Sequence, residues 1–543
     1  MRKKLLGSVG MCVLGAAMLV AAVLAGPASS STSRQAKTGG TLNVAHSAGD
    51  FDNLDPAIAY VQDDWMVEYV TCLKLMNTPD KGPPAGSNLI PDAAAGFPVV
   101  AKNGKTYTFT IKPGFKFNTG EAVTAATFKA AFDRDSDPAM NSPVTAFIDD
   151  VVGVKAVLDK KAKSVSGVTA SGMKLTIRLT HPDGGLLNKL ALPFFCAIPV
   201  SLPHDPNGIQ TPPSAGPYYI ASRTVNRQVV LKKNPNYHGP RPRGTDTIVI
   251  TTNTDQQQTV LQVRNGTYAY DMGAGPPPAD YAGLAKDFGV NKSRFFVNQQ
   301  LTTWYLALNT SRGPMTNVKL RQATNYAIDR PSLTRLFGYL GGKRTTQLLP
   351  AALAGGNYKA VYPIRGADPR KAKQLAGNCG NLELWTTTSA NGSAVGQLAK
   401  FELTQAGCNV TIKPFQGSSI YTAAGTKGAS FDVMRSGWIA DYPDPYDFYH
   451  LLLDGTTIVA SNNTNFSYFD NPSVNAAIAT DNLLTGAARL KAYGALDLST
   501  MSKYAPIAPY TNSNNHDFIS GKVGGYTYAP FVGAADLATF FLK

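Results

Sequence analysis

The histidines are the first candidates for metal or acid–base chemistry, and they lack the spacing that such chemistry requires. The six are His46, His181, His204, His238, His450 and His516. None is placed four residues from another with an intervening glutamate, as zinc proteases require, and the chain has neither a Gly-x-Ser-x-Gly elbow nor a Walker loop. The short glycine motif Gly273-Ala274-Gly275 runs into three prolines, which cannot open a phosphate-binding helix. The sequence therefore favours a binding protein over an enzyme, and we expect no metal and no cofactor.

Cysteine is the second residue type that could form a functional or structural bond. One of the five cysteines, Cys12, lies within an apolar N-terminal stretch, which leaves Cys72, Cys196, Cys379 and Cys408. An even number of cysteines in an exported chain favours disulfides, and four cysteines allow three pairings. Four buried free thiols are the alternative.

One of the three pairings follows from the elements expected around two of the cysteines. Cys379 precedes a strand-like run at 382–385 and Cys408 precedes another at 410–412, with a helix-like segment at 397–405 between them. In a strand–helix–strand unit the two strand starts lie side by side, within disulfide reach. We therefore favour this pairing, which leaves the other two cysteines to each other.

The net charge is strongly positive, yet its distribution argues against nucleic acid as a partner. Lysine and arginine number 51 and aspartate and glutamate 36, which gives +15. Beyond the N-terminus the densest basic stretches are Lys160, Lys161 and Lys163, and the pair Lys232–Lys233. A nucleic-acid groove needs a clustered basic stripe with interleaved aromatic residues, and no such motif is present.

The N-terminus indicates export. Basic residues at 2–4 precede an apolar stretch at 5–25 and then small residues, which is the pattern of a secretory signal peptide. We expect a signal peptide at 1–28 and a flexible Ser/Thr-rich linker at 29–40. An uncleaved anchor helix is the alternative, because the apolar run is about as long as a bilayer requires. Met11 directly before Cys12 argues against a lipid anchor.

The body of the chain must position any site, and its pattern indicates an α/β fold of more than one domain. At roughly 150 residues per domain, 543 residues suggest two to four domains. Residues 106–112 alternate apolar and polar side chains and are followed by Pro113-Gly114, which predicts a hairpin with a second strand at 115–117. Further strands are expected at 39–44, 175–179, 228–231 and 247–251, and helices at 124–134, 317–328 and 368–375.

Several blocks of sequence occur in an order that is itself informative. They are 39–42 (GGTL) with 53–56 (NLDP), 103–120 (NGKTYTFTIKPGFKFNTG), 215–219 (AGPYY) with 234–237 (NPNY), 305–310 (YLALNT) with 318–330 (VKLRQATNYAIDR), and 437–445 (GWIADYPDP). In this order they resemble the extracellular solute-binding proteins of the peptide/nickel ABC importer family (family 5, oligopeptide/dipeptide-binding-like). Two features depart from that pattern: residues 125–127 (AAT) replace an acidic pair, and the lipid-anchor cysteine is missing.

The resemblance implies a two-lobed, periplasmic-binding-protein-like clamp with an extra subdomain in the first lobe. Lobe I would combine residues 41–80, 214–295 and 515–543, the extra subdomain would occupy 81–213, and lobe II would run from 296 to 514. Hinge closure would enclose a ligand between the lobes. A closed cleft removes water from the ligand, so that a few polar groups decide what binds.

The resemblance also implies which residues contact a ligand. Asp441 would pair with the α-ammonium of a peptide through a charge-assisted hydrogen bond, although a structural aspartate in the turn beside Pro443 is the alternative. Gly437 would offer a backbone contact, and Trp438 would form an apolar wall or simply pack in the core.

Three further residues complete the expected contact set. Tyr60 and Val61 belong to a loop that lines the cleft in relatives, and Tyr305 matches an aromatic residue that faces the ligand. A strand tyrosine is otherwise often a core residue. No basic residue matches the one that would bind a peptide's terminal carboxylate.

Three functions from different classes follow. The first is an exported receptor that passes an oligopeptide or a similar solute to an ABC importer, acting as a monomer with permease and ATPase subunits as partners. Its ligand could instead be an oligosaccharide, a metal chelate or an amine. The others are a secreted hydrolase or transferase on the same clamp, and a surface adhesin or sensor. The expected location is the cell surface, the periplasm or the outer face of the cytoplasmic membrane.

Overall fold

The computed structural model describes residues 39–543, so the signal peptide and most of the linker expected from the sequence lie outside the described residues. Within the described part of the chain, no helix combines the length and the apolar character needed to span a bilayer. The segments expected to be strands and helices are found close to their predicted positions, with one exception described below.

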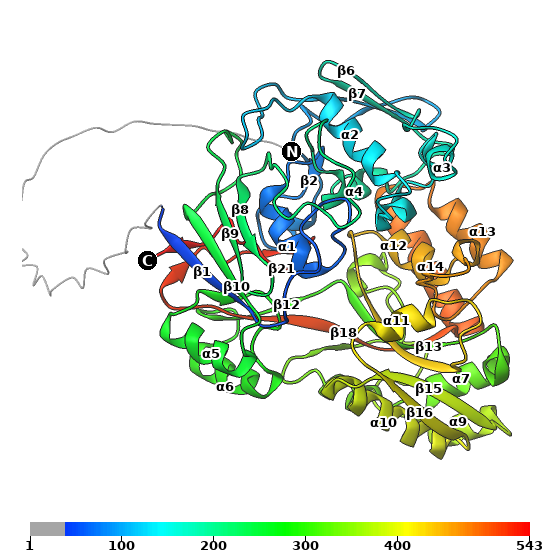
Figure 1. Ribbon diagram of the computed structural model, residues 1–543. Helices are drawn as coiled ribbons and strands as arrows, with labels where there is room; N and C mark the ends of the chain where they lie inside the picture. Colours follow the sequence, from blue (N-terminus) through cyan, green and yellow to red (C-terminus); the bar gives the residue numbers. More distant parts are fainter. Residues whose placement is uncertain (1–38) are drawn as a thin grey trace, which may run out of the picture. The chain divides into compact units, whose positions relative to one another are not determined.

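The first sheet gathers strands from two widely separated segments of the chain, 41–46 and 218–271 (Figure 1). Its order is β11 (Tyr270–Asp271), β1 (Thr41–His46), β10 (Thr247–Thr252), β9 (Gln228–Lys233) and β8 (Tyr218–Thr224). β1 is parallel to β10 and to β11, whereas β10, β9 and β8 are antiparallel neighbours. Leu42 and Val44 of β1 are fully buried, as expected for a strand inside a sheet covered by other elements.

The second sheet carries several of the residues that line the candidate functional site. Its order is β12 (Phe295–Gln299), β18 (Ile507–Phe518), β13 (Thr302–Leu308), β17 (Val433–Ile439), β15 (Asn381–Thr387) and β16 (Asn409–Phe415), with β14 (Gly342–Arg344) also paired to β18. β15, β16 and β17 are parallel to one another. The long strand β18 pairs with β13 at one end and with β12 at the other, and beyond β12 it meets the first sheet through a bridge between Tyr270 and Ile519.

The third sheet corrects the hairpin predicted from the sequence. Its order is β4 (Val99–Val100), β5 (Thr106–Thr110), β7 (Lys174–Arg178) and β6 (Val168–Ser171). β5 forms as expected, but residues 115–117 are not a strand and form only an isolated bridge between Lys116 and Ala122. Both edges of β5 are already occupied by β4 and β7, so no edge is left for residues 115–117. The prediction of a hairpin at 106–117 was therefore wrong.

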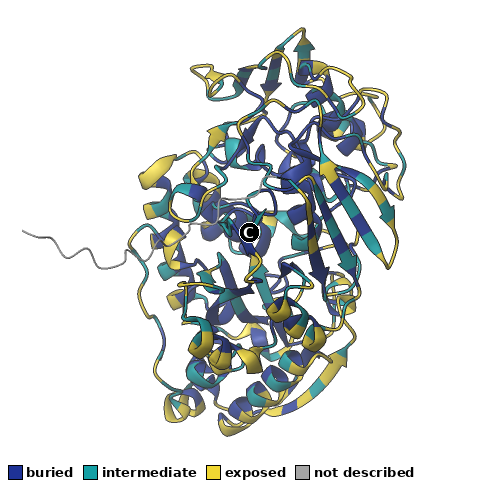
Figure 2. Ribbon diagram, turned by 90° about the vertical axis from the view of Figure 1, so that its left-hand side faces the viewer, coloured by how far each residue is buried: buried dark blue, intermediate teal, exposed yellow. Residues whose placement is uncertain are grey.

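The helices pack around these sheets, and Figure 2 shows exposed residues in yellow and buried residues in dark blue. Their bounds are α1 (Gln62–Thr71), α2 (Ala125–Asp135), α3 (Val154–Leu158), α4 (Leu186–Lys189), α5 (Gln256–Asn265), α6 (Tyr281–Phe288), α7 (Val318–Ala327), α8 (Arg330–Arg335), α9 (Pro369–Ala376), α10 (Ala390–Gln405), α11 (Ser419–Ala424), α12 (Pro445–Leu453), α13 (Pro472–Asp481) and α14 (Gly486–Lys503). Short two-stranded ladders pair β2 (Met76–Asn77) with β3 (Ile90–Pro91), β19 (Val523–Gly524) with β22 (Phe541–Leu542), and β20 (Tyr528–Ala529) with β21 (Ala534–Ala535).

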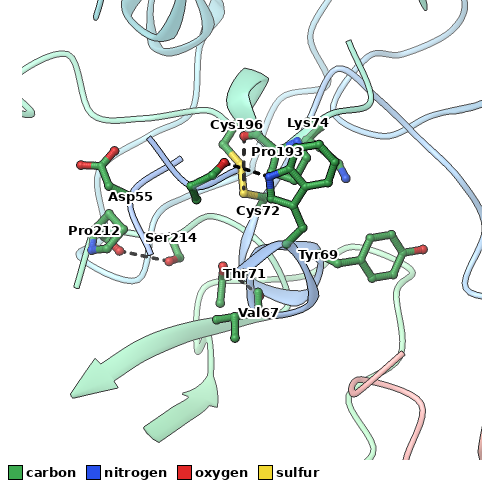
Figure 3. The surroundings of a disulfide bond; sticks show 12 residues. Asp55, Val67, Tyr69, Thr71, Cys72, Lys74, Pro193, Cys196, Pro212 and Ser214 are labelled. Atoms are coloured by element: carbon green, nitrogen blue, oxygen red, sulfur yellow. Dashed lines mark hydrogen bonds between the residues drawn. A yellow bond between two sulfur atoms is a disulfide. The ribbon is translucent and has the colours of Figure 1, made fainter. Parts of the chain in front are cut away.

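Two disulfides join the cysteines in the pairs favoured from the sequence. Cys379 and Cys408, whose Cα atoms are 4.9 Å apart, stand just before β15 and β16 in a strand–helix–strand unit that contains α10. Cys72 follows α1 directly and is bonded to Cys196, with a Cα–Cα distance of 5.3 Å (Figure 3). The Cys72–Cys196 bond thus ties α1 to a segment 124 residues away. By the chain-entropy model, the bond that closes a 29-residue loop stabilises the fold by about 3–4 kcal/mol.

Candidate functional site

Five of the six residues expected to contact a ligand line one cavity of about 440 Å³. Tyr60 and Val61 come from the loop before α1, and Gly437, Trp438 and Asp441 come from the end of β17 and the turn after it. These two segments are separated by more than 370 positions in the chain. The cavity therefore forms only when both parts of the chain are folded together. The structure therefore brings together residues that only the sequence resemblance had connected.

Tyr305 does not line this cavity, so the structure does not bring it together with the other five expected residues. It is only 2% exposed and belongs to the hydrophobic core that also contains Met434. Its neighbour Trp304 lines the cavity instead, opposite Gly437 in the ladder between β13 and β17. Successive side chains of a strand point to opposite faces, so an offset of one residue exchanges a wall residue for a core residue.

Gly437 is required by the packing of the cavity wall. A Cβ atom at position 437 would lie 2.4 Å from the indole ring of Trp304, closer than real Cβ contacts come. The indole is also held from other sides, because its Nε1 donates a hydrogen bond to Ser513 Oγ at 3.2 Å and the Arg435 guanidinium stacks on the ring at 4.4 Å. The absence of a side chain at Gly437 lets Trp304 lie flat against β17. Arg435 is a basic residue behind this wall that the sequence analysis did not single out.

Asp441 is bonded to groups from both halves of the site. Tyr60 donates its hydroxyl hydrogen to Asp441 Oδ2 at 2.9 Å. A second carboxylate lies next to it, because Asp447 Oδ2 accepts from the Trp438 indole N–H at 2.9 Å and from the backbone N–H of Asp441 at 3.2 Å. The aspartate at 447, which the sequence analysis did not single out, therefore fixes the orientation of both Trp438 and the turn that carries Asp441.

The two carboxyl groups share an environment that disfavours negative charge. Burial raises the pKa of Asp441 to about 7, although the Tyr60 hydrogen bond opposes the increase. Burial, followed by repulsion from Asp441, raises the pKa of Asp447 well above its ordinary value. Within residues 39–543 neither side chain has a basic partner within 4.0 Å, and Asp447 Oδ1 has no hydrogen-bond partner. A buried acid of this kind is most favourable when a cation is supplied to it.

The loop that carries Tyr60 is anchored by a fully buried ion pair. Arg134 of α2 donates to both carboxylate oxygens of Asp55, at 2.6 and 2.7 Å, and both side chains are at most 1% exposed. The same carboxylate accepts the backbone N–H groups of Ala57, at 3.1 Å, and Ile209, at 2.8 Å. The NLDP block thus holds the course of the loop rather than contacting a ligand itself.

The turn that carries Asp441 is anchored in a parallel way. Arg489 of α14 donates to both carboxylate oxygens of Asp444 at 2.8–3.0 Å, and the two side chains are at most 5% exposed. Asp444 also caps α12 by accepting the backbone N–H of Tyr446 at 2.8 Å. Each half of the site therefore depends on a bidentate buried Arg–Asp pair, which is a geometry of high specificity.

Much of the remaining wall of the cavity is aromatic and was not predicted from the sequence. Trp65 comes from α1, Tyr421 from α11, and Phe466 and Phe531 come from loops. Tyr421 and Phe466 are stacked, with ring centroids 5.8 Å apart. These residues lie far apart in the sequence, and their neighbours range from acidic to apolar, so no local signal marks them as one surface.

A second, larger cavity of about 770 Å³ adjoins the first one. Tyr60 and Thr464 line both cavities. The remaining residues that line the second cavity come chiefly from segments 141–158 and 450–464, and most of them are polar. Together the two cavities offer an apolar space beside Asp441 and a more polar space beyond Tyr60.

Comparisons with known proteins agree with this geometry. Residues 88–460 match the family described as "Bacterial extracellular solute-binding proteins, family 5 Middle". The chain is 26% identical to the periplasmic murein peptide-binding protein MppA of Escherichia coli over 89% of this chain and 90% of that protein, and 24% identical to the periplasmic oligopeptide-binding protein OppA of Salmonella typhimurium over 78% and 80%.

The fold of this chain is similar to the folds of solved structures. The structure named "Clavulanic acid biosynthesis oligopeptide binding protein 2" is similar with a TM-score of 0.86, at 24% identity, over 93% of this chain and 96% of that one. This likeness confirms the α/β, two-lobed, periplasmic-binding-protein-like clamp with an extra subdomain that the sequence resemblance implied.

Proposed function

The chain belongs to the bacterial extracellular solute-binding proteins of family 5, and we propose that it is an exported receptor that captures an oligopeptide, or a similar solute with a free amino group, between its two lobes. The observation that carries this proposal is the buried Asp441 carboxyl, which has no basic partner among residues 39–543 and lies in a cavity lined from both halves of the fold.

The chemistry of Asp441 selects an amine. A ligand ammonium would supply the positive charge that the described residues do not place beside Asp441, and would donate a charge-assisted hydrogen bond to its carboxylate. The Tyr60 hydroxyl would donate a second hydrogen bond to the same carboxylate. In a cavity closed to water, both the ammonium and the carboxylate are costly to leave unpaired, so each requires the other. This reciprocal need gives a receptor specificity for ligands with a free amino terminus.

The relatives support the same conclusion, because the named ones are murein peptide-binding and oligopeptide-binding proteins of the periplasm. By analogy with them, this chain would deliver its ligand to the permease and ATPase subunits of an ABC importer, act outside the cytoplasmic membrane, and work as a monomer without catalytic chemistry. We propose the lobe boundaries given above, with residues 41–80, 214–295 and 515–543 in lobe I, 81–213 in the extra subdomain and 296–514 in lobe II.

The proposed function is tested by identifying what the protein carries. The protein is purified under native conditions, denatured, and the released small molecules are analysed by mass spectrometry. We expect short peptides or related solutes with a primary amine. Release of an oligosaccharide or a metal chelate without an amine, at one molecule per protein, would contradict the proposal.

The raised pKa of Asp441 predicts how ligand binding depends on pH. The pKa of Asp441 in the folded protein is about 7, above the ordinary value near 3.8. Between these two pH values the carboxyl is therefore protonated in the folded, unliganded protein and ionised in the unfolded chain. This group's contribution to folding stability therefore falls as pH rises through that window, and binding of an ammonium must expel the proton.

We expect the affinity for the tripeptide Ala-Ala-Ala to rise by up to about tenfold per pH unit below pH 7 and to level off above pH 7, where Asp441 is already ionised. The affinity should fall again above about pH 8, where the peptide's α-amino group loses its proton. Calorimetry at pH 6 in buffers of different ionisation enthalpy should show release of about one proton per bound peptide. The Asp441→Asn protein provides the control and should release none. A pH-independent affinity of the unmutated protein would contradict the ammonium pairing.

A further inference from the structure

Aromatic side chains form much of the wall beside Asp441. Six of them come from six different segments of the chain: Trp65, Trp304, Tyr421, Trp438, Phe466 and Phe531. Trp65, Phe466 and Phe531 are each at most 6% exposed, so their rings are fixed by packing on the side away from the cavity. Asp441 is the one charged residue that lines this cavity within the described part of the chain.

The position of the ammonium decides which part of a peptide meets this wall. In a peptide the α-ammonium and the first side chain are attached to the same carbon atom. If the ammonium lies at Asp441, the first side chain must lie in the same cavity of about 440 Å³. The rest of the peptide is not confined there, because the cavity of about 770 Å³ continues beyond Tyr60 and Thr464.

The two cavities differ in the chemistry that they favour. The second one is lined by hydroxyl and amide side chains and by the carboxylate of Asp149, for example Ser142, Thr145 and Asn462. The first one offers chiefly aromatic and aliphatic faces, the polar side chains of Gln62 and Thr464, and a single carboxylate that the ammonium would occupy. An acidic first side chain would find no basic residue among the described residues that line this cavity, so its charge would lose water without gaining a counter-charge.

We infer that the ligand is a peptide whose first residue has an apolar side chain, aromatic or branched aliphatic, held against this aromatic wall. This inference rests on the proposed function, because it requires the amino terminus to lie at Asp441. Full burial of a large apolar side chain in such a cavity is the kind of interaction that distinguishes ligands by one to two orders of magnitude.

The inference is tested with four tripeptides that differ only in the first residue. Isothermal titration of the full protein is performed with Phe-Ala-Ala, Leu-Ala-Ala, Ala-Ala-Ala and Asp-Ala-Ala, and with N-acetylated Phe-Ala-Ala. We expect the Phe and Leu peptides to bind about 10- to 100-fold more tightly than Ala-Ala-Ala, and Asp-Ala-Ala to bind about tenfold or more weakly than Ala-Ala-Ala. The acetylated peptide should bind much more weakly than its free counterpart.

The outcomes separate this inference from the proposed function. If the four free peptides bind equally and acetylation still abolishes binding, the amine pairing stands and the apolar preference is wrong. If acetylation has no effect, the proposed function itself fails.

A wall variant adds a second readout. Tyr421→Ser should reduce the ratio of Phe-Ala-Ala to Ala-Ala-Ala affinity about tenfold, and Phe466→Ser serves as a second variant in case the first is poorly folded. Tyr339→Ser is the matched control, since Tyr339 is 50% exposed and does not line the cavity; its ratio should be unchanged. An unchanged ratio in both folded wall variants would overturn the inference.

Discussion

Replacing Asp441 with asparagine is expected to weaken the binding of Ala-Ala-Ala by about 2–5 kcal/mol, the usual cost of removing one partner of a desolvated charge pair. Asparagine keeps the size of the side chain and can still accept from the Tyr60 hydroxyl, which lies 2.9 Å from Asp441 Oδ2. What it loses is the negative charge that an ammonium requires. The effect is measured by calorimetry at pH 7.5, where the carboxyl of the unmutated protein is mostly ionised.

The Asp441→Asn protein should nevertheless fold normally. Because burial disfavours the charge of Asp441, its removal should leave the free energy of unfolding of the unliganded protein unchanged or slightly increased at this pH. The matched control is Asp287→Asn, an exposed aspartate whose ion pair with Arg264 lies on the surface, and it should not change binding. Normal binding by Asp441→Asn, or its failure to fold, would make Asp441 a structural residue.

The second large effect concerns stability rather than binding. Replacing Arg134 with methionine is expected to lower the free energy of unfolding by about 3–5 kcal/mol, because it leaves the Asp55 carboxylate buried without its cation. Urea denaturation followed by circular dichroism measures this loss. Since Asp55 holds the loop that leads to Tyr60, any ligand affinity that remains in the folded fraction should also be reduced.

A surface pair supplies the control for the buried one. Arg264→Met breaks the ion pair between Arg264 and Asp287, whose two side chains are 43% and 45% exposed respectively. This substitution should change the free energy of unfolding by no more than about 0.5 kcal/mol. If Arg134→Met is as mild as the surface variant, the NLDP block does not anchor the loop through this ion pair. The double variant Asp55→Leu/Arg134→Met should recover part of the lost stability, because it removes both buried charges.

Local patterns were sufficient for much of the fold. Thr124 was expected to start a helix, and it caps α2 through a capping box with Thr127. The strand–helix–strand pattern between Cys379 and Cys408 was enough to predict a disulfide, since parallel strands joined by a helix begin at the same edge. In both cases the deciding interactions lie within about 30 residues of sequence.

The features that the sequence could not predict depend on distant segments. The Pro113-Gly114 turn suggested a hairpin, but the partners of β5 come from β4 and β7, and the latter lies more than 60 residues away. Tyr305 and Trp304 are both aromatic residues of β13, so residue type alone does not predict which of them lines the cavity. The pairing of β13 with β17 places Trp304 opposite Gly437 at the cavity. The aromatic wall is assembled from separate segments, so it becomes visible only once they are folded together.

The central claim is that the Asp441 carboxylate binds a ligand's free amino terminus, and a double cycle tests it most directly. Calorimetry is performed with Ala-Ala-Ala and with its N-acetylated form, on the unmutated protein and on Asp441→Asn. We predict that acetylation and the substitution each cause a large loss of affinity, whereas the substitution adds little to the loss already caused by acetylation, which gives a coupling energy of about 2 kcal/mol or more. Losses that simply add, with a coupling energy near zero, would contradict the account.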